Sequence, residues 1–590
     1  SLADVAWYPL PMWTGRGMME ANKKALVFIG DDFIPMCLVV DKLKEKKATE
    51  SYEVCGIGQA ADDLPRIYDR ARHVGPMGRA AKILRAGIFD VIVGSDACLD
   101  VDLVGIAKKV GAKLIWTGSK GLEGVRDRTG EGVEGIVKDA LAGEAIWVRD
   151  EDKAAEVVMK VLEGAGEKSG DNLMDDAEAK AEAQKCRDNC DLCFYACPSG
   201  VLVSRGVKAV KKEGLKALTD LEKKCCLHGK CGEACPENIR IPDMMVSTHA
   251  QTAADDKFLF RAGRVFATNN EIRAYGYTAF PGNCPGWFSI LGCGGANPDD
   301  VQWMANELAS RNAIVGMSGC AVGDYAHLYD PEERKWAMQR YPFWMQPRSA
   351  ANYGGCSACQ FLPTVTLKNA RTTGITHYAN YAETVAIPFE RYACNTIIWG
   401  PASERMYSIA TALARSGAAV VVGPISGLNW PRVMPGNKWD WERYWVYEAL
   451  SMKKKVVEPS PKHLVIPVET REEAVNMAMC LNMKPGQGFR MGFFEGWLDS
   501  HEEYFAELPD DWTRFVRSLA DLPIMQRMRL VGELTGKHGW KIEGVSVKEV
   551  PHPDGRKLSQ KDYLNEYGMG DMPSTRIPRL GIRSAVDRKP

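Results

Sequence analysis

The stretch Cys186-Arg-Asp-Asn-Cys190-Asp-Leu-Cys193-Phe-Tyr-Ala-Cys197-Pro198 is the first of two cysteine-rich runs. The second is Cys225-Cys226-Leu-His228-Gly-Lys-Cys231-Gly-Glu-Ala-Cys235-Pro236. Both runs end in C-x3-C-P, part of the spacing that binds [4Fe–4S] clusters, and the first also contains C-x2-C. Thiolates are the soft ligands that such clusters need. The two runs therefore predict a helical, ferredoxin-like module with two [4Fe–4S] clusters.

The predicted ligands of these clusters are seven cysteines and one histidine: Cys186, Cys190, Cys193, Cys197, Cys225, His228, Cys231 and Cys235. The first run has C-x3-C where C-x2-C is usual, which is a one-residue bulge. The second run has His228 at a position where a cysteine is usual, close to the additional Cys226. Two alternatives stay open. Either His228 binds iron through an imidazole nitrogen, which generally raises the potential of a cluster, or Cys226 takes its place.

Composition excludes several classes of function. The chain has 590 residues and a net charge of -1, which gives no footprint for nucleic acid. No uninterrupted apolar segment is long enough to predict a membrane span. The 18 cysteines favour metal ligation in a reducing cytoplasm, because disulfide frameworks are typical of small secreted chains. The N-terminal residues lack the pattern of a secretory signal, so the expected location is cytoplasmic.

The rest of the chain alternates strand-like and helix-like segments. Apolar runs that end in glycine recur at 25–30, 89–94, 287–292, 313–319, 396–400 and 418–423. This βαβ rhythm predicts an α/β fold with Rossmann-like parallel-sheet domains, into which the ferredoxin-like module is inserted. The expected regions are a first Rossmann-like domain at 1–165, the insertion at 166–252, a second Rossmann-like domain at 253–450 and a C-terminal α/β region with an extended tail at 451–590.

Cysteines follow several of the predicted strands. Cys98, Cys293 and Cys320 each stand just past a strand, and Cys356 follows the turn Tyr353-Gly-Gly355. Ligands of open parallel sheets bind at the carboxyl ends of strands, so a metal cluster in such a crevice could collect thiolates from distant parts of the chain. Each cysteine taken alone also fits a small buried side chain, which is the common structural role of this residue.

The chain resembles the α subunit of the archaeal nickel-dependent carbon monoxide dehydrogenase, part of the acetyl-CoA decarbonylase/synthase complex. The hybrid cluster proteins are more distant relatives. The resemblance is carried by Phe28-Ile-Gly-Asp-Asp-Phe-Ile-Pro35, Phe89-Asp-Val-Ile-Val-Gly-Ser-Asp-Ala-Cys98, Asp127-Arg-Thr129, Cys235-Pro-Glu-Asn-Ile239, Ser318-Gly-Cys320 and Glu507-Leu-Pro-Asp-Asp-Trp512. It implies the fold of that family and its nickel–iron–sulfur centre, the C-cluster, which converts CO and water to CO2 and back.

The resemblance also implies the metal ligands. Four cysteine positions of the family's C-cluster correspond to Cys98, Cys293, Cys320 and Cys356. Three other positions differ. The iron-binding histidine of the family is Asp31 here, one ligand cysteine falls at Gly58-Gln59, and the acid–base lysine is Arg405. Asp31 and Arg405 are therefore the candidate catalytic residues, and Asp31 is also a candidate metal ligand, harder than imidazole. Cys55 and Cys359 are candidates for a replacement thiolate.

These differences predict an altered site. Arginine does not readily release a proton, whereas a buried lysine can. We therefore expect a subunit that relays electrons between an iron–sulfur cluster at the C-cluster position, with or without nickel, and the two clusters of the insertion, without the standard CO reaction. Three alternatives stay open: an active carbon monoxide dehydrogenase, a redox enzyme for another small molecule, and a non-catalytic assembly subunit. The expected partners are other subunits of a multi-protein redox complex and a ferredoxin-like electron carrier, in an oligomer.

Overall fold

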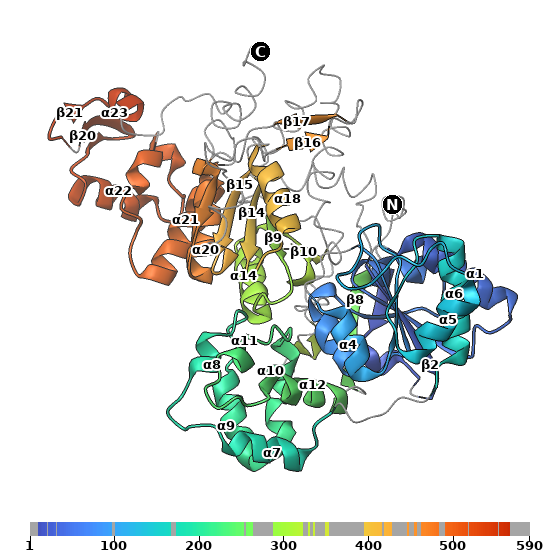
Figure 1. The fold of residues 1–590 in the computed structure, drawn as a ribbon. Coiled ribbons are helices and arrows are strands. Elements are labelled where there is room, and N and C mark those ends of the chain that lie inside the picture. The colour runs from blue at the N-terminus through green and yellow to red at the C-terminus, as the bar shows by residue number, and fades with distance from the viewer. Residues whose placement is uncertain are drawn as a thin grey trace.

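The computed structural model contains two parallel-sheet α/β units and a helical insertion (Figure 1). It describes residues 10–20, 22–30, 32–96, 101–166, 173–252, 255–262, 287–321, 329–330, 334–336, 349–352, 394–415, 418–426, 445–447, 453–456, 462–482, 490–516, 518–552 and 554–566. Among those residues, no helix combines the length and the apolar character that a membrane crossing requires. The expected α/β fold with parallel sheets is confirmed.

The first sheet is formed by six parallel strands in the order β4-β3-β2-β5-β6-β7. Their bounds are Arg72–Gly75 (β4), Tyr52–Ile57 (β3), Lys24–Ile29 (β2), Val91–Gly94 (β5), Lys113–Trp116 (β6) and Ile146–Trp147 (β7). Counted along the chain, this is the 3-2-1-4-5-6 order of a doubly wound sheet. Its ligand crevice is expected between β2 and β5, where the strand order reverses.

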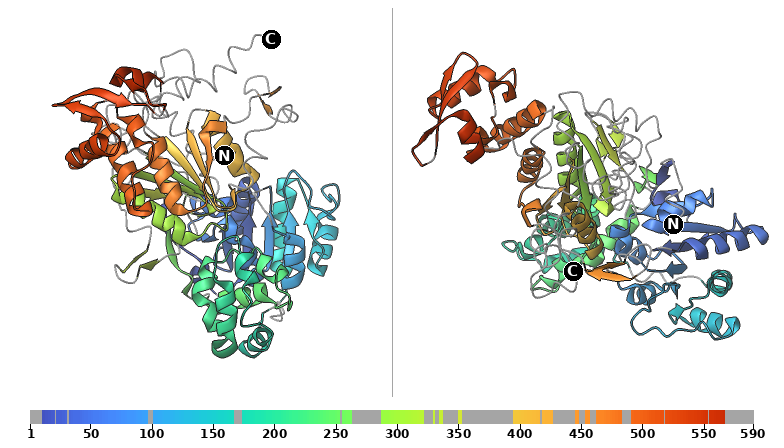
Figure 2. Two further views of the ribbon diagram at one scale, coloured as in Figure 1. Left: turned by 90° about the vertical axis from the view of Figure 1, so that its left-hand side faces the viewer. Right: turned by 90° about the horizontal axis from the view of Figure 1, so that it is seen from above.

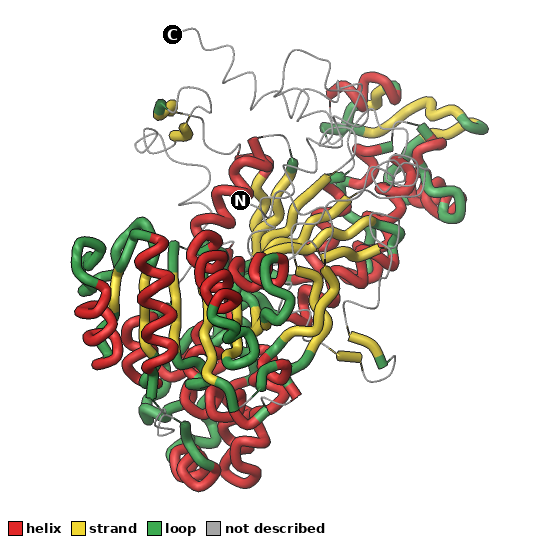
Figure 3. Tube along the Cα trace, turned by 90° about the vertical axis from the view of Figure 1, so that its right-hand side faces the viewer, coloured by secondary structure: helices red, strands yellow, loops and turns green. Residues whose placement is uncertain are grey.

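Helices cover both faces of the first sheet, so its strands are apolar on both sides (Figure 3). In β2, Leu26 and Phe28 pack in one core, and Val27 and Ile29 pack in the core on the opposite face. The first core is completed by α1 (Phe33–Glu45), α5 (Val133–Ala142) and α6 (Glu151–Gly164), and the second by α3 (Ala80–Arg85) and α4 (Leu103–Val110).

The second sheet repeats the same topology, in the order β13-β10-β9-β14-β15-β18. The bounds are Ser349–Asn352 (β13), Ile314–Gly319 (β10), Trp287–Gly292 (β9), Cys394–Trp399 (β14), Ala419–Gly423 (β15) and Val465–Pro467 (β18). All five pairings are parallel. This unit extends beyond the expected boundary at residue 450, because β18 pairs with β15 and α20 (Arg471–Leu481) packs in the same core.

The insertion between the two sheets is built from helices and loops, with no strand between residues 173 and 252. It lies below both sheets in Figure 1. Its helices are α7 (Asp176–Gln184), α8 (Leu192–Tyr195), α9 (Val203–Glu213), α10 (Thr219–Lys224), α11 (Lys230–Glu233) and α12 (Ile241–Gln251). They enclose a separate apolar core, against which several of the cysteines pack.

Two further contacts complete the architecture. The strand β1 (Leu10–Thr14) pairs antiparallel with β8 (Phe258–Ala262), which follows the insertion. The C-terminal region has α21 (Arg490–Phe505), α22 (Arg527–Gly536), α23 (Gln560–Glu566) and a three-stranded sheet of β19 (Lys541–Glu543), β20 (Ser546–Pro551) and β21 (Lys557–Leu558). In both views of Figure 2, this three-stranded sheet and α23 lie at the end of the molecule away from the first sheet.

Candidate metal sites

One small cavity of the insertion is surrounded by four of the predicted ligands. They are Cys186, Cys190, Cys193 and Cys235. The first three belong to the first cysteine run and the fourth closes the second run. In two-cluster ferredoxins the last cysteine of one run binds the cluster of the other run, so this exchange matches the predicted module.

A second small cavity shows the reciprocal arrangement. Cys197, which closes the first run, lines this cavity together with Cys225 and Cys231 of the second run. His228 and Cys226 line it as well. Every predicted ligand of the insertion therefore lies at one of the two cavities, and both candidates for the remaining position lie at the same one.

Four thiols at these cavities favour the protonated form when no metal is bound: Cys186, Cys193, Cys225 and Cys231. Burial raises the pKa of Cys193 to about 11 and that of Cys231 to about 12. Burial also raises the pKa values of Cys186 and Cys225. Metal ligation requires thiolates, so binding of a cation would release these protons and compensate the buried negative charge.

The identity of these side chains fits iron–sulfur clusters, which take thiolate and, less often, imidazole ligands. Within the described ranges, no three Cys, His, Asp or Glu side chains are close enough to hold one metal ion. Each thiolate of a cubane binds a different iron, so its ligands lie farther apart than those around one ion. The cysteines that line the two small cavities form no disulfides. The donor set of four thiols at one cavity, and of three thiols with a histidine or a fourth thiol at the other, fits [4Fe–4S] clusters.

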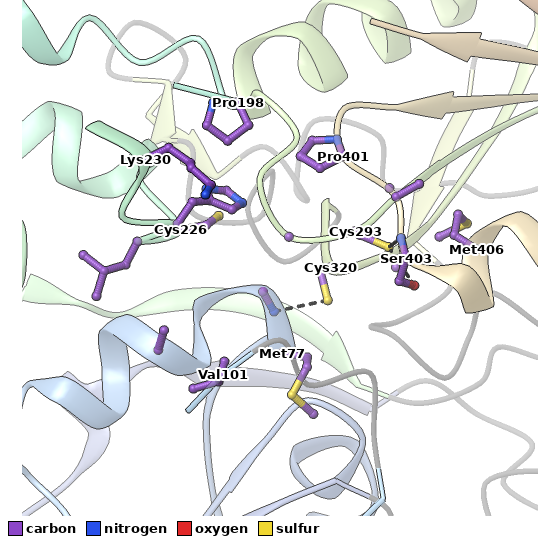
Figure 4. A pocket seen from close by; sticks show the side chains of 18 of the residues that line it. Met77, Val101, Pro198, Cys226, Lys230, Cys293, Cys320, Pro401, Ser403 and Met406 are labelled. Carbon is purple, nitrogen blue, oxygen red and sulfur yellow. Dashed lines mark hydrogen bonds between the residues drawn. The ribbon is translucent and has the colours of Figure 1, made fainter. Parts of the chain in front are cut away.

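A much larger cavity, of about 500 Å³, lies between the insertion and the two sheets (Figure 4). Three parts of the fold line this cavity. The first α/β unit contributes Met77, Gly78, Ala81 and Val101, and the insertion contributes Pro198, Cys226, Leu227, His228 and Lys230. The second α/β unit contributes Gly292, Cys293, Gly294, Gly319, Cys320, Pro401, Ala402, Ser403, Met406 and Ile409. The structure thus brings Cys293 and Cys320, two of the predicted C-cluster ligands, to one cavity.

Cys293 lies at the reversal point of the second sheet. It follows β9, and the neighbouring strand β14 leads into α18 (Glu404–Arg415). The carbonyl of Ser403 accepts the first helical hydrogen bond, from Tyr407 N–H (3.1 Å), so Ser403 is the N-cap of α18. The backbone N–H of Ser403 donates to Cys293 Sγ (3.1 Å), and the Ser403 Oγ lies 3.3 Å from the same sulfur. The helix N-terminus therefore stabilises negative charge on Cys293.

Cys320, which follows β10, is held by the first unit. The backbone N–H of Gly78 donates to Cys320 Sγ (3.3 Å). Residue 78 must be glycine, because an added Cβ would lie 2.2 Å from the Cα of Gly294. The two α/β units therefore touch backbone to backbone beside the two thiols.

A buried ionic network holds the insertion against the first unit. Lys82, which is fully buried, donates from Nζ to the carbonyl of Glu222 (2.8 Å), and its Nζ lies 2.6 Å from the Glu222 carboxylate. Arg79 donates to the carbonyl of Lys223. Both cations thus satisfy carbonyls at the C-terminal end of α10, where positive charge is favourable. Cys225 follows this helix end directly, so the network positions the second cysteine run.

The network continues to the last helix of the insertion. His249 Nδ1 lies 2.7 Å from the Glu222 carboxylate, and Arg16 donates to the His249 carbonyl. Burial lowers the pKa of His249 to about 4, although its contact with Glu222 opposes this shift. Burial disfavours the charged form of Glu222, but Lys82 and His249 outweigh it and lower the Glu222 pKa. At neutral pH the network therefore contains an ionised Glu222 and a neutral His249.

Of the remaining predicted site residues, only Arg405 and Cys55 lie within the described ranges. Asp31, Cys98, Cys356 and Cys359 lie outside the described residues. Arg405 lies in the first turn of α18, with its backbone described and its side chain not. Cys55 lies in β3, fully buried in the apolar core, and is not among the residues that line the large cavity.

Sequence reasoning missed several residues that shape the sites. Gly78 and Lys82 carry no recognisable motif, and only the fold shows that they contact Cys320 and Glu222. The placement of Cys226 and His228 on the large cavity was also not anticipated, because it depends on how the insertion docks. The one local signal was the predicted strand at 396–400, which ends three residues before Ser403, because ligands of parallel sheets bind beyond the carboxyl ends of strands.

No protein-family model matches the chain. Solved structures similar to it include the nickel-free carbon monoxide dehydrogenase from Thermococcus sp. AM4 (13% identity, TM-score 0.44, 86% of this chain and 62% of that one). Another is carbon monoxide dehydrogenase IV from Carboxydothermus hydrogenoformans (12%, TM-score 0.40, 80% and 61%). The chain therefore spans less than two thirds of each of these solved chains.

Other relatives have a higher sequence identity to the chain than these solved structures. The chain is 31% identical over 555 residues to the acetyl-CoA decarbonylase/synthase complex subunit alpha 1 of Archaeoglobus fulgidus, covering 92% of this chain and 69% of the relative. It is 28% identical over 554 residues to the alpha subunit of that complex in Methanocaldococcus jannaschii, covering 92% and 71%. The chain belongs to the family of acetyl-CoA decarbonylase/synthase α subunits, as its resemblance implied.

Proposed function

We propose that this chain is an iron–sulfur subunit that relays electrons between a metal centre in the large cavity and two [4Fe–4S] clusters in the insertion. The observation that carries the proposal is the exchange of the last cysteine between the two runs. Cys235 lies with the first run and Cys197 with the second. A structural role for these cysteines would not require a reciprocal pairing of this kind.

The residues of the insertion would hold two clusters. Cys186, Cys190, Cys193 and Cys235 form one ligand set, and Cys197, Cys225 and Cys231 with His228 or Cys226 form the other. Such clusters supply one-electron redox chemistry when they are bound. The apolar core of the insertion contains Cys193, packs against five more of these cysteines and limits their contact with water. The helix α8 contributes Cys193 to one set and leads into Cys197 of the other, so the two sites are neighbours.

The large cavity would hold the third centre. Cys293 and Cys320 would be two of its ligands, and Cys98, Cys356 and Asp31 remain predicted ligands. The N–H groups of Ser403 and Gly78 donate to the two thiolates and stabilise their charge. Lys230 and His228 also line the cavity, and no carboxylate is among the described lining residues. This balance of charge favours an anionic, thiolate-bound centre.

The standard CO reaction is not part of the proposal. Gly58, at a position where the family has a cysteine, adopts a left-handed conformation, and an added Cβ would lie 2.6 Å from the Met77 methyl group. Met77 lines the large cavity and packs where a ligand side chain from residue 58 would begin. The replacement of the family's acid–base lysine by Arg405 removes a group that can release a proton.

The proposed partners follow from the family and from the surface. The relatives are named as subunits of the acetyl-CoA decarbonylase/synthase complex, and we propose that this chain assembles in a related multi-protein complex. Leu192 and Tyr195 flank Cys193 on α8 and are 53% and 80% exposed. An apolar surface beside a cluster ligand suits transient docking of a ferredoxin-like electron carrier.

Anaerobic purification followed by iron and sulfide analysis tests the relay. The expected result is iron beyond the content of two [4Fe–4S] clusters, with dithionite-reducible signals in electron paramagnetic resonance. If protein that is purified and reconstituted anaerobically shows no iron-dependent signals, the proposal is wrong. Reduction of a dye with CO as the electron donor is expected to be absent, and turnover with stoichiometric nickel would show an active carbon monoxide dehydrogenase instead.

Redox catalysis on another small molecule is the second candidate function. It is favoured by the volume of the large cavity, about 500 Å³, which is within the range of small-molecule sites. An exchangeable ligand on the third centre, detected as a spectral change on addition of small anions or gases, supports this candidate. If protein ligands occupy every position of the centre and its spectrum does not change on such additions, electron relay remains as the only proposed function.

A further inference from the structure

Among the described residues, three thiols line the large cavity, and one of them comes from the insertion. Cys226 is 5% exposed and faces the cavity from the side opposite Cys293 and Cys320 (Figure 4). Neither its position in the chain nor the family resemblance assigns it to this cavity. The second sheet and the insertion thus both contribute cysteine sulfur, a soft metal ligand, to the same cavity.

The backbone separates Cys226 from its neighbour Cys225. Leu227 adopts a left-handed conformation (φ 62°), which is uncommon for a residue other than glycine. Its N–H donates to Cys225 Sγ (3.3 Å), so the turn closes around Cys225. Cys225 lines only the small cavity, whereas Cys226 lines the small and the large one.

The small cavity has a complete set of ligands without Cys226. The positions Cys225, His228 and Cys231 follow C-x2-C-x2-C spacing with histidine at the middle position, and Cys197 supplies the fourth donor. An imidazole at His228 is an accepted ligand for iron in iron–sulfur clusters. Cys226 lies outside this ligand spacing and also lines the larger cavity.

We propose that Cys226 is a thiolate ligand of the metal centre in the large cavity, and that His228 completes the cluster in the small one. This inference rests on the proposed function, since it requires a centre in the large cavity. Binding of iron to Cys226 forms one Fe–S bond and releases the thiol proton to solvent. The insertion thereby supplies a thiolate to a site that lacks one at Gly58.

A direct consequence concerns the electron path. Cys225 would bind one centre and Cys226 the next, so a single peptide unit would join the ligands of both. The insertion would then close the larger site in addition to carrying electrons away from it. Docking of the insertion through Lys82 and Glu222 becomes a condition for assembling the larger centre.

Two variants with a matched control test the proposal. After anaerobic reconstitution, C226S is expected to lose the iron of the large cavity and to retain both insertion-cluster signals in electron paramagnetic resonance. H228A is expected to lose one insertion-cluster signal and to retain the iron of the large cavity. C37S is the control, because Cys37 lies on α1 and lines none of the three cavities.

The opposite pattern overturns the inference. If C226S loses an insertion-cluster signal and H228A keeps both, Cys226 belongs to the small cavity. Unchanged iron in C226S shows that Cys226 is not a ligand of either site. Wild-type protein with iron for the two insertion clusters only contradicts the proposed function itself, before any variant is compared. If a variant does not fold, a wild-type density map at the iron edge decides whether Cys226 Sγ is bonded to iron.

Discussion

The residues that line the small cavities of the insertion are close together in the sequence, whereas those that line the large cavity are far apart. The small cavities take all their candidate ligands from residues 186–235. The large cavity takes lining residues from positions 77–409, contributed by three parts of the fold. The small sites therefore depend on local helix packing, whereas the large site depends on how the insertion and both α/β units dock.

Removal of a local ligand is expected to have the largest effect. The variant C193A should lose the cluster of Cys186, Cys190 and Cys235, because three cysteines leave one iron without a protein ligand. The second insertion cluster and the large cavity should retain their iron, as measured by iron content and electron paramagnetic resonance. C37S again serves as the control. Simultaneous loss of all iron in C193A would show that the sites are not independent.

Breaking the docking network should affect the large cavity selectively. The variant K82M removes one partner of the buried ion pair with Glu222, and breaking such a pair costs about 3–5 kcal/mol. We expect a lower unfolding midpoint and loss of iron from the large cavity, with the cluster of Cys186, Cys190, Cys193 and Cys235 retained.

A neighbouring lysine provides the control for this experiment. Lys223 forms an exposed pair with Asp220, three residues before it on α10. Exposed pairs contribute little to stability, so K223M should leave the unfolding midpoint and the iron content unchanged. Equal effects of K82M and K223M would contradict a specific role for the buried network.

Acidification should weaken the same contact between the insertion and the first unit. The unfolded chain protonates His249 near pH 6.5, whereas burial lowers the pKa in the folded chain to about 4. Stability is therefore complete above pH 6.5 and falls as the pH drops through this window. The expected loss from pH 7 to pH 5 is about 2 kcal/mol, measured by denaturant unfolding. Lys82 and Arg16 face the ring and oppose its protonation, and Glu222 favours it.

The variant H249Q isolates this contribution. It removes the titrating group, so stability should vary less between pH 7 and pH 5 than in the wild type. The lowered pKa of Glu222 adds a loss of the same sign at lower pH, which both proteins should show. An unchanged pH dependence in H249Q would assign the effect to other groups.

Much of the local architecture could be predicted from the sequence. The cysteine spacing identified the ligands that line the small cavities, because each run folds into short helices that keep sequence neighbours together. The apolar runs identified the strands β9 and β10, and hence the positions of Cys293 and Cys320 at the ends of these strands. The docking of the insertion was not predictable, because Lys82 and Glu222 are 140 residues apart and carry no motif.

The smallest predicted effect concerns the helix end beside Cys293. The variant S403A keeps the backbone N–H that donates to Cys293 Sγ and removes the Oγ that lies 3.3 Å from this sulfur. We expect a loss of about 1 kcal/mol in stability, the usual contribution of one hydrogen bond, and a shifted spectrum of the large-cavity centre. T470A removes the hydroxyl that caps α20, away from the cavity, and should reduce stability alone. Identical spectra in S403A and wild type would show that the hydroxyl does not influence the centre.

Anomalous diffraction at the iron edge, from crystals grown without oxygen, tests the account most directly. The account predicts three separate groups of iron: one at Cys186, Cys190, Cys193 and Cys235, one at Cys197, Cys225 and Cys231, and one between Cys293 and Cys320. Thiols without iron at the two small cavities, in protein reconstituted with iron and sulfide, would contradict it.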